Sequence, residues 1–143
     1  DPTVRLKTIA QMLNAAQKPV EKAVLEGLDE NDKETAESVR EYMFVWDDLA
    51  RLDKKTMQKV LGSVETRTLA IALKGSAKVI EDNIMNNLSK RVQVMVKDER
   101  ELAGPMPLTE VLVARNELLK AARALLEGGE GAASAAKGEE LVA

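Results

Sequence analysis

The first part of the chain, residues 5–42, has apolar side chains every three or four positions, which is the spacing of one helix face. Pro19 suits the first turn of a helix, and Asn31 or Asp32 can cap another. The pattern therefore predicts three short helices, each of which is only half apolar.

Three such helices bury little surface among themselves, and a repeat of an armadillo-like stack packs on neighbours at both ends. We expect residues 1–42 to form an armadillo-like helical module whose apolar face contacts another chain or an upstream segment. The residues expected on that face are Ile9, Leu13, Val24, Leu28 and Val39. The alternative is that these helices pack on the rest of the chain as one compact bundle.

Beyond residue 46, capping residues predict five further helices. The first is helix 54–61, which is capped by Asp53. The second begins at Glu65 or Thr66 and ends at Gly75, and the third begins at Ser76. The fourth is helix 90–103, capped by Ser89 and ended by Gly104-Pro105, and the last is a long helix that begins at Thr109 with Glu110. Each has an apolar face. The residues expected to point inward include Val79, Ile80 and Ile84 in the third helix, Val92, Met95, Val96 and Leu102 in the fourth, and Val111, Leu112 and Leu118 in the last.

The second of these helices ends in five consecutive apolar residues, a lysine and a glycine. The run 69–73 cannot face one side of a helix, so we expect it to be buried on several sides, with Lys74 emerging at the C-terminal end. A cation is favoured there by the helix dipole, and Gly75 can adopt the left-handed conformation that closes the helix. Taken alone, this stretch fits a lysine that only caps its helix.

The composition favours an all-α fold. Tyr42, Phe44 and Trp46 are the only aromatic residues, and the other apolar residues are Ala, Leu, Val, Ile and Met, which suit helix-on-helix packing. A chain of 143 residues can bury one core, or two small cores joined by a hinge. Because the chain begins without Met and in a polar stretch, we expect it to be a segment of a longer protein.

Several function classes are disfavoured. The chain has neither cysteine nor histidine, which removes thiol nucleophiles, zinc–thiolate sites and the commonest general base. Its carboxylates are scattered or adjacent in sequence rather than arranged for catalysis. The net charge of −3 argues against a nucleic-acid surface, and no apolar run approaches the ~18 to 20 residues of a membrane span. We expect a soluble protein that is not an enzyme and that uses no cofactor or metal.

Five short blocks resemble, in order and spacing, the C-terminal region of the FliG family of flagellar motor switch proteins. The blocks are Met43–Leu49, Leu52-Asp53, Val64–Arg67 continuing to Ala72–Gly75, Asn87–Arg91, and Gly104-Pro105. The closing Gly138–Val142 also resembles a common ending of the family. Residues 5–42 match more weakly, mainly in helical pattern and length.

The resemblance implies a component of the flagellar rotor whose C-terminal domain interacts electrostatically with the cytoplasmic loop of a MotA-type stator protein. The family's functional charges fall on Lys74, Arg91, Asp98 and Glu99 of this sequence. One position departs from the family pattern, because Pro107 stands where many members carry an arginine. The charge pattern of the stator-facing surface is therefore expected to differ from that of other members.

The resemblance also implies partners, a location and a domain organisation. The expected partners are the rotor proteins FliM and FliF and neighbouring FliG subunits, at the cytoplasmic face of the inner membrane and without direct insertion into it. Met43, Phe44, Val45 and Trp46 correspond to a hinge that reorients the charge-bearing domain, residues 47–129, when the motor switches direction. Simple anchoring of the large side chains in the core is the alternative for this block. Residues 130–143, rich in Ala and Gly, are expected to be a flexible tail.

The geometry of helix 90–103 can be considered separately from the resemblance. At about 100° per residue, Arg91 and Asp98 project within about 20° of each other and off the apolar stripe, so both can be exposed on one edge. The same geometry places Glu99 among apolar residues, where it either snorkels at the boundary of the stripe or pairs with a basic group from another helix. The alternative for these charges is an ordinary solvated helix face.

Two other classes of protein fit the sequence less well. An armadillo-type or magnesium-sensor-like helical adaptor of another assembly would use the same repeat packing, but it would need neither a charged edge on helix 90–103 nor the block at 43–46. An enzyme would need a convergent set of titratable groups, which the sequence lacks.

Overall fold

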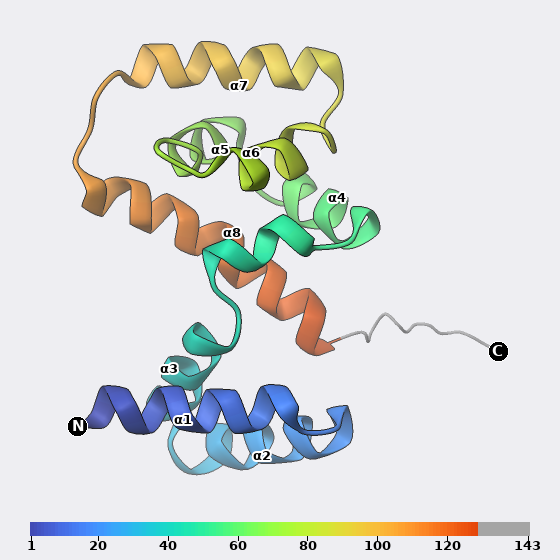
Figure 1. Ribbon diagram of the computed structural model, residues 1–143, viewed down its shortest axis with the longest axis vertical. Helices are drawn as coiled ribbons and strands as arrows, with labels where there is room; N and C mark the ends of the chain where they lie inside the picture. The colour runs from blue at the N-terminus through green and yellow to red at the C-terminus, as the bar shows by residue number, and fades with distance from the viewer. Residues whose placement is uncertain (129–143) are drawn as a thin grey trace, which may run out of the picture. The chain divides into compact units, whose positions relative to one another are not determined.

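The computed structural model describes residues 1–128, and Figure 1 shows that these residues form helices joined by short turns, with no strand among them. This confirms the predicted all-α fold class. The chain divides into two compact units, Asp1–Val45 and Trp46–Ala143, which are described separately as the N-terminal and C-terminal units. The tail predicted at residues 130–143 lies outside the described residues.

The N-terminal unit consists of α1 (Pro2–Ala15), α2 (Lys18–Asn31) and α3 (Lys33–Met43). Asp32 caps α3 by accepting a hydrogen bond from the backbone N–H of Thr35 at 3.2 Å, as one of the two predicted caps. Helices α1 and α2 both pack on α3, and the residues buried between them are Ala10, Leu13, Leu25 and Val39.

An ion pair also joins α2 to α3. Both terminal nitrogens of Arg40 donate to the carboxylate of Asp29, at 2.9 and 2.7 Å, which is the two-pronged geometry that favours arginine over lysine. These hydrogen bonds, opposed in part by desolvation, hold the pKa of Asp29 below its usual range.

The C-terminal unit begins with the 3₁₀ helix η1 (Trp46–Arg51), followed by α4 (Lys54–Gly62), α5 (Thr66–Ala72), α6 (Lys78–Met85), α7 (Lys90–Ala103) and α8 (Leu108–Gly128). Helix α5 lies between α7 and α8, and it packs extensively on both (Figure 1). The large side chains that are fully buried include Leu49, Met57, Leu69, Leu73, Ile80, Ile84, Val96 and Leu118.

The predicted caps of α4 and α7 are both present. The carboxylate of Asp53 accepts from the backbone N–H of Thr56 at 2.9 Å, and the hydroxyl of Ser89 accepts from the N–H of Val92 at 3.2 Å. At the other end of α7, Gly104 has a φ of +62°, which a residue with a Cβ rarely adopts. The bounds of α7 therefore follow from local sequence.

Two predicted helix ends were wrong. Helix α5 ends at Ala72 rather than at Gly75, so Lys74 lies in a turn. Ser76 does not open the next helix, because α6 begins at Lys78 after Ala77, and the Ser76 hydroxyl instead accepts a hydrogen bond from the indole N–H of Trp46. The hydrogen bond from Trp46, thirty residues earlier in the chain, thus takes the place of the predicted helix cap at Ser76.

Four residues predicted to point inward are exposed, among them Met95 of α7 at 41%. Val79 is 62% exposed because the buried face of α6 is formed by Ile80 and Ile84 alone. Leu102 is 79% exposed, since α7 packs mainly on one helix, α5, and fully buries only Val96. Leu112 is also exposed, so the buried stripe of α8 is narrower than predicted.

Candidate functional site

Helix α7 presents two opposite charges to solvent. Arg91 lies in its first turn and Asp98 lies two turns further along, about 10 Å away at the ~1.5 Å rise per residue of an α-helix. Both side chains are exposed, and neither forms an ion pair or hydrogen bond within residues 1–128. These two charges are therefore available to a partner.

Glu99 differs from its neighbour on α7. Its carboxylate lies 3.9 Å from Nη1 of Arg67, which belongs to α5, and the Glu99 side chain is only 33% exposed. Of the two alternatives considered for this residue, the structure contains the pairing with a basic group of another helix. The charge of Glu99 is thus partly satisfied inside the C-terminal unit.

Lys74 lies beside the C-terminal end of α7. The turn that carries it closes through Gly75, whose φ is +69°, as expected for a left-handed glycine after a helix. The Lys74 side chain is half-buried, and its Nζ donates to the backbone carbonyl of Arg100 at 3.5 Å, in the last turn of α7. The ammonium group therefore faces the negative end of the α7 dipole, and the turn that carries it follows the C-terminal end of α5.

Arg115, on α8, binds the backbone of the same turn. Nε of Arg115 donates to the carbonyl of Ala72, and Nη2 donates to that of Lys74, each at 2.8 Å. Burial lowers the pKa of Arg115, while the nearby carboxylate of Asp47 acts in the opposite direction, and the guanidinium stays charged. Sequence reasoning missed Arg115 because no local pattern links it to a turn 41 residues away.

Pro107 immediately precedes α8, and its carbonyl accepts the first backbone hydrogen bonds of that helix, from Glu110 at 3.1 Å and Val111 at 3.4 Å. A proline is suited to this position because its backbone nitrogen has no hydrogen to satisfy. The position contributes no charge to the surface of the C-terminal unit.

The predicted hinge segment, residues 43–46, is held at both ends. Met43 is the last residue of α3, and its carbonyl accepts from Nδ2 of Asn14 at 3.2 Å within the N-terminal unit. Trp46 is the first residue of η1, and its Nε1 donates to the Ser76 hydroxyl at 3.0 Å within the C-terminal unit. Phe44 and Val45 connect these two anchored residues.

The residues predicted for a partner interface fall into three groups. Leu13 and Val39 lie in the core of the N-terminal unit, Ile9 and Leu28 are half-buried against that core, and Val24 is 40% exposed. The apolar residues most exposed on the same unit are Val4, Met12 and Val20 on α1 and α2, which the sequence analysis did not select.

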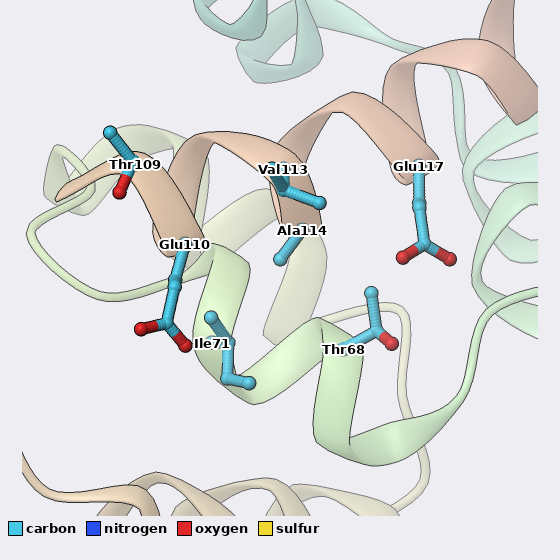
Figure 2. Close-up of a pocket in the computed structure, with 7 residues that line it drawn as sticks. All are labelled: Thr68, Ile71, Thr109, Glu110, Val113, Ala114 and Glu117. Carbon is cyan, nitrogen blue, oxygen red and sulfur yellow. The ribbon is translucent and has the colours of Figure 1, made fainter. Parts of the chain in front are cut away.

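A shallow pocket of about 300 Å³ lies between α5 and α8, and Figure 2 shows its lining. Ile71 and Val113 contribute apolar surface, while the carboxylates of Glu110 and Glu117 stand at its edge. None of the four charges predicted to be functional lines it. Two hydroxyl groups, of Thr68 and Thr109, complete the polar part of its lining.

The four candidate residues of the site are all charged. In residues 1–128 no three carboxylates gather closely enough to hold a metal ion. Within that same range, no helix is long and apolar enough to cross a membrane. The structure thus brings Lys74, Asp98 and Glu99 to the C-terminal half of α7, with Arg91 at its N-terminal end.

Comparisons with known proteins show which family this chain resembles. The family model described as the FliG C-terminal domain matches residues 26–130. The flagellar motor switch protein FliG of Thermotoga maritima is 36% identical over 137 residues, which is 96% of this chain and 41% of that protein. FliG of Bacillus subtilis is 29% identical over 96% of this chain and 40% of the relative.

Solved structures support the same fold. The structure of full-length FliG from Aquifex aeolicus superposes with a TM-score of 0.78 at 27% identity, covering 87% of this chain and 39% of that one. A crystal structure of a FliG fragment from Helicobacter pylori gives a TM-score of 0.61 at 27% identity, covering 87% of this chain and 58% of the other. The chain spans about 40% of the length of the curated relatives just named. It belongs to the FliG family of flagellar motor switch proteins and contains the family's C-terminal domain.

Proposed function

We propose that this chain is the stator-facing part of a flagellar rotor protein and that α7 carries the contact with the stator. The observation that carries the proposal is the pair of exposed, unpaired charges, Arg91 and Asp98, on one edge of that helix. A cytoplasmic loop of a MotA-type stator with the opposite order of charges would complement this edge.

The four candidate charges have different roles in the proposal. Arg91 and Asp98 make the contact, because both are exposed. Lys74 adds positive potential near the C-terminal end of α7, where its ammonium lies 3.5 Å from the Arg100 carbonyl. Glu99 is shared between the stator and Arg67, so its contribution is the smallest.

The magnitudes suit a contact that is made and broken repeatedly. An exposed ion pair contributes about 0 to 1 kcal/mol, and physiological salt screens charges beyond about 8 Å. Two or three such pairs guide a stator loop into place without holding it there. A buried apolar interface of ordinary size would release far more slowly.

We also propose that residues 43–46 act as a hinge between the units and that direction switching uses it. Anchored ends and a short connecting segment are what a hinge requires, and both Met43 and Trp46 are hydrogen-bonded within their own units. The packing of the large side chains on either side gives the segment discrete positions rather than continuous flexibility.

The N-terminal unit is proposed to be an armadillo-like module that contacts another chain or an upstream segment. Four exposed apolar residues of α1 and α2 support this proposal, namely Val4, Met12, Val20 and Val24. The partners implied by family membership are neighbouring FliG subunits and the rotor proteins FliM and FliF, at the cytoplasmic face of the inner membrane.

Removal of residues 47–128 from the gene in its own bacterium tests the proposal as a whole. The rotor should still assemble through the remaining parts of the protein, and the flagella should not rotate in a tethered-cell assay. Normal rotation of these cells would contradict the proposal. A control strain that lacks only residues 130–143 should rotate its flagella.

A further inference from the structure

Arg115 of α8 contacts two separate parts of the C-terminal unit at once. Its guanidinium donates to the carbonyls of Ala72 and Lys74, at the end of α5 and in the turn that follows. The carbon atom at the centre of the same guanidinium lies 4.8 Å from the centroid of the Trp46 ring, which is within the range of a cation–π interaction. One planar cation is therefore both a cap for the α5 carbonyls and a stacking partner for Trp46.

Trp46 is bound to the same turn from its other side. Its Nε1 donates to the hydroxyl of Ser76 at 3.0 Å, and Ser76 follows Gly75, which has a φ of +69°. A tryptophan provides both an aromatic face for the guanidinium and an N–H donor for the hydroxyl. Trp46, Arg115 and the turn 73–76 thus form a closed set of contacts.

The contacts continue from the turn to α7. The backbone of Lys74 is held by Arg115, and its side chain donates to the carbonyl of Arg100. The hydrogen bonds of Arg115 are charge-assisted, partly buried and fixed by the planar shape of the guanidinium, so they resist displacement better than a lysine would.

We infer that Arg115 is a positioning residue that makes Trp46 and the turn carrying Lys74 move as one rigid block. This inference rests on the proposed function, because it gives the hinge segment a physical connection to one of the charges near the stator-facing helix. A displacement of Trp46 is passed to the Lys74 backbone through the guanidinium, rather than being absorbed in the turn. Without Arg115, of the two contacts described above only the hydrogen bond from Trp46 to Ser76 would connect Trp46 to the turn.

Hydrogen exchange of the complete 143-residue chain tests this coupling. The amides of Lys74 and Ser76 donate to the carbonyls of Ile71 and Leu73, each at 3.1 Å, and they report on the turn. The amide of Thr56, bonded to the carboxylate of Asp53 at the start of α4, is a reference site in the same unit. Because Trp46 is the only tryptophan of the chain, its emission and its quenching by acrylamide report on the stacking directly.

Arg115→Met should accelerate exchange at Lys74 and Ser76 by at least about tenfold, because it removes two charge-assisted hydrogen bonds and the loss of one alone corresponds to about tenfold. Exchange at Thr56 should stay unchanged, and acrylamide should quench Trp46 more strongly. Lys120→Met is the matched control, since it removes an exposed cation from the same helix and should change none of these signals. Equal acceleration at all three amides, or an unchanged turn, would overturn the inference.

The milder variant Trp46→Phe covers the case in which Arg115→Met does not fold. It keeps an aromatic face and loses only the N–H that reaches Ser76. The inference predicts faster exchange at Lys74 as well as at Ser76 in this variant, and no additional effect at Lys74 when Arg115→Met is already present. Additive effects of the two substitutions would show that Arg115 does not couple the two parts.

The exchange measurements do not involve the motor, so their outcome is separate from that of the proposed function. If both proposals hold, Arg115→Met should also lower torque in cells, whereas Lys120→Met should not. If the exchange results agree with the rigid block but the Arg115→Met cells have normal torque, the block exists and its role in the motor is contradicted.

Discussion

Glu99 of α7 and Arg67 of α5 face each other with 3.9 Å between the carboxylate and the guanidinium. Asp98, the neighbouring residue, has no such partner within residues 1–128. Of these two adjacent acidic residues, Glu99 is thus paired within the C-terminal unit, whereas Asp98 is exposed and unpaired within residues 1–128.

The Arg67–Glu99 pair should contribute little to stability, because the two side chains are 60% and 33% exposed. A double-mutant cycle with Arg67→Met and Glu99→Gln should give a coupling energy of about 0 to 1 kcal/mol that decreases with added salt. Urea denaturation of the four proteins supplies the measurement. A coupling energy above roughly 2 kcal/mol, insensitive to salt, would mean that the pair fixes α7 in place.

The cap of α4 gives a prediction on pH. The backbone N–H of Thr56 and, after it, the Thr56 hydroxyl hold the pKa of Asp53 below its usual value of 3.8. Because the pKa is lower in the folded state, the ionised cap stabilises the protein above about pH 4, and that stabilisation is lost as the pH falls through the folded-state pKa. Titration of the Asp53 carboxyl by NMR should therefore give a midpoint below 3.8.

The same cap should be visible in mutants. Asp53→Ala should lower the free energy of unfolding by about 1 kcal/mol at pH 7, whereas Asp53→Asn should keep most of the cap. Chemical denaturation followed by helical circular dichroism compares the two. Equal losses in both variants, or a midpoint of titration at or above the usual value, would exclude the capping role.

The hinge proposal concerns Phe44 and Trp46. Replacement of both by leucine should change the distribution of distances between a label in residues 5–42 and a label in residues 47–128, measured by fluorescence energy transfer. In cells the same variant should bias or lock the direction of rotation, while the helices on either side remain folded. An unchanged distribution together with normal switching would leave these side chains with an anchoring role only.

The apolar face of the N-terminal unit gives a prediction about association. Met12 is 66% exposed and Val20 is 52% exposed, so Met12→Asp with Val20→Asp should leave the three helices folded. The double variant should weaken copurification with other rotor subunits, and the exposed polar substitution Gln11→Asp should not. Full copurification of the double variant, or a chain that stays strictly monomeric at high concentration, would argue against an interface here.

The sequence was sufficient to predict those features of the fold that depend on residues close together in the chain. The caps Asp53 and Ser89 and the stop at Gly104 each act within a few residues, so the bounds of α4 and α7 could be predicted closely. The exposure of Arg91 and Asp98 followed from helical periodicity alone.

The parts that could not be predicted depend on contacts between distant segments. Leu102 has the sequence pattern of a buried residue, but α7 has one main packing partner in its unit and leaves that side uncovered. The role of Ser76 depends on Trp46, thirty residues earlier, and the position of Lys74 depends on Arg115. No single-sequence pattern carries such pairings.

The central claim is that Arg91 and Asp98 meet stator charges, and reversal of both charges tests it most directly. In an Arg91→Asp/Asp98→Lys strain, two repulsive pairs replace two weak attractive ones, whereas single neutral substitutions should be tolerated because each pair contributes only about 0 to 1 kcal/mol. Both residues are exposed, so rotor assembly should be normal.

The measurement is the torque of tethered cells of this double-reversal strain, with rotor assembly checked separately and with compensating charge reversals made in the stator loop. The account predicts an assembled rotor with strongly reduced torque, and recovery of torque when the stator charges are reversed as well. Normal torque in the double-reversal strain, or failure of the rotor to assemble, would contradict the account and leave Arg91 and Asp98 as ordinary solvated charges of α7.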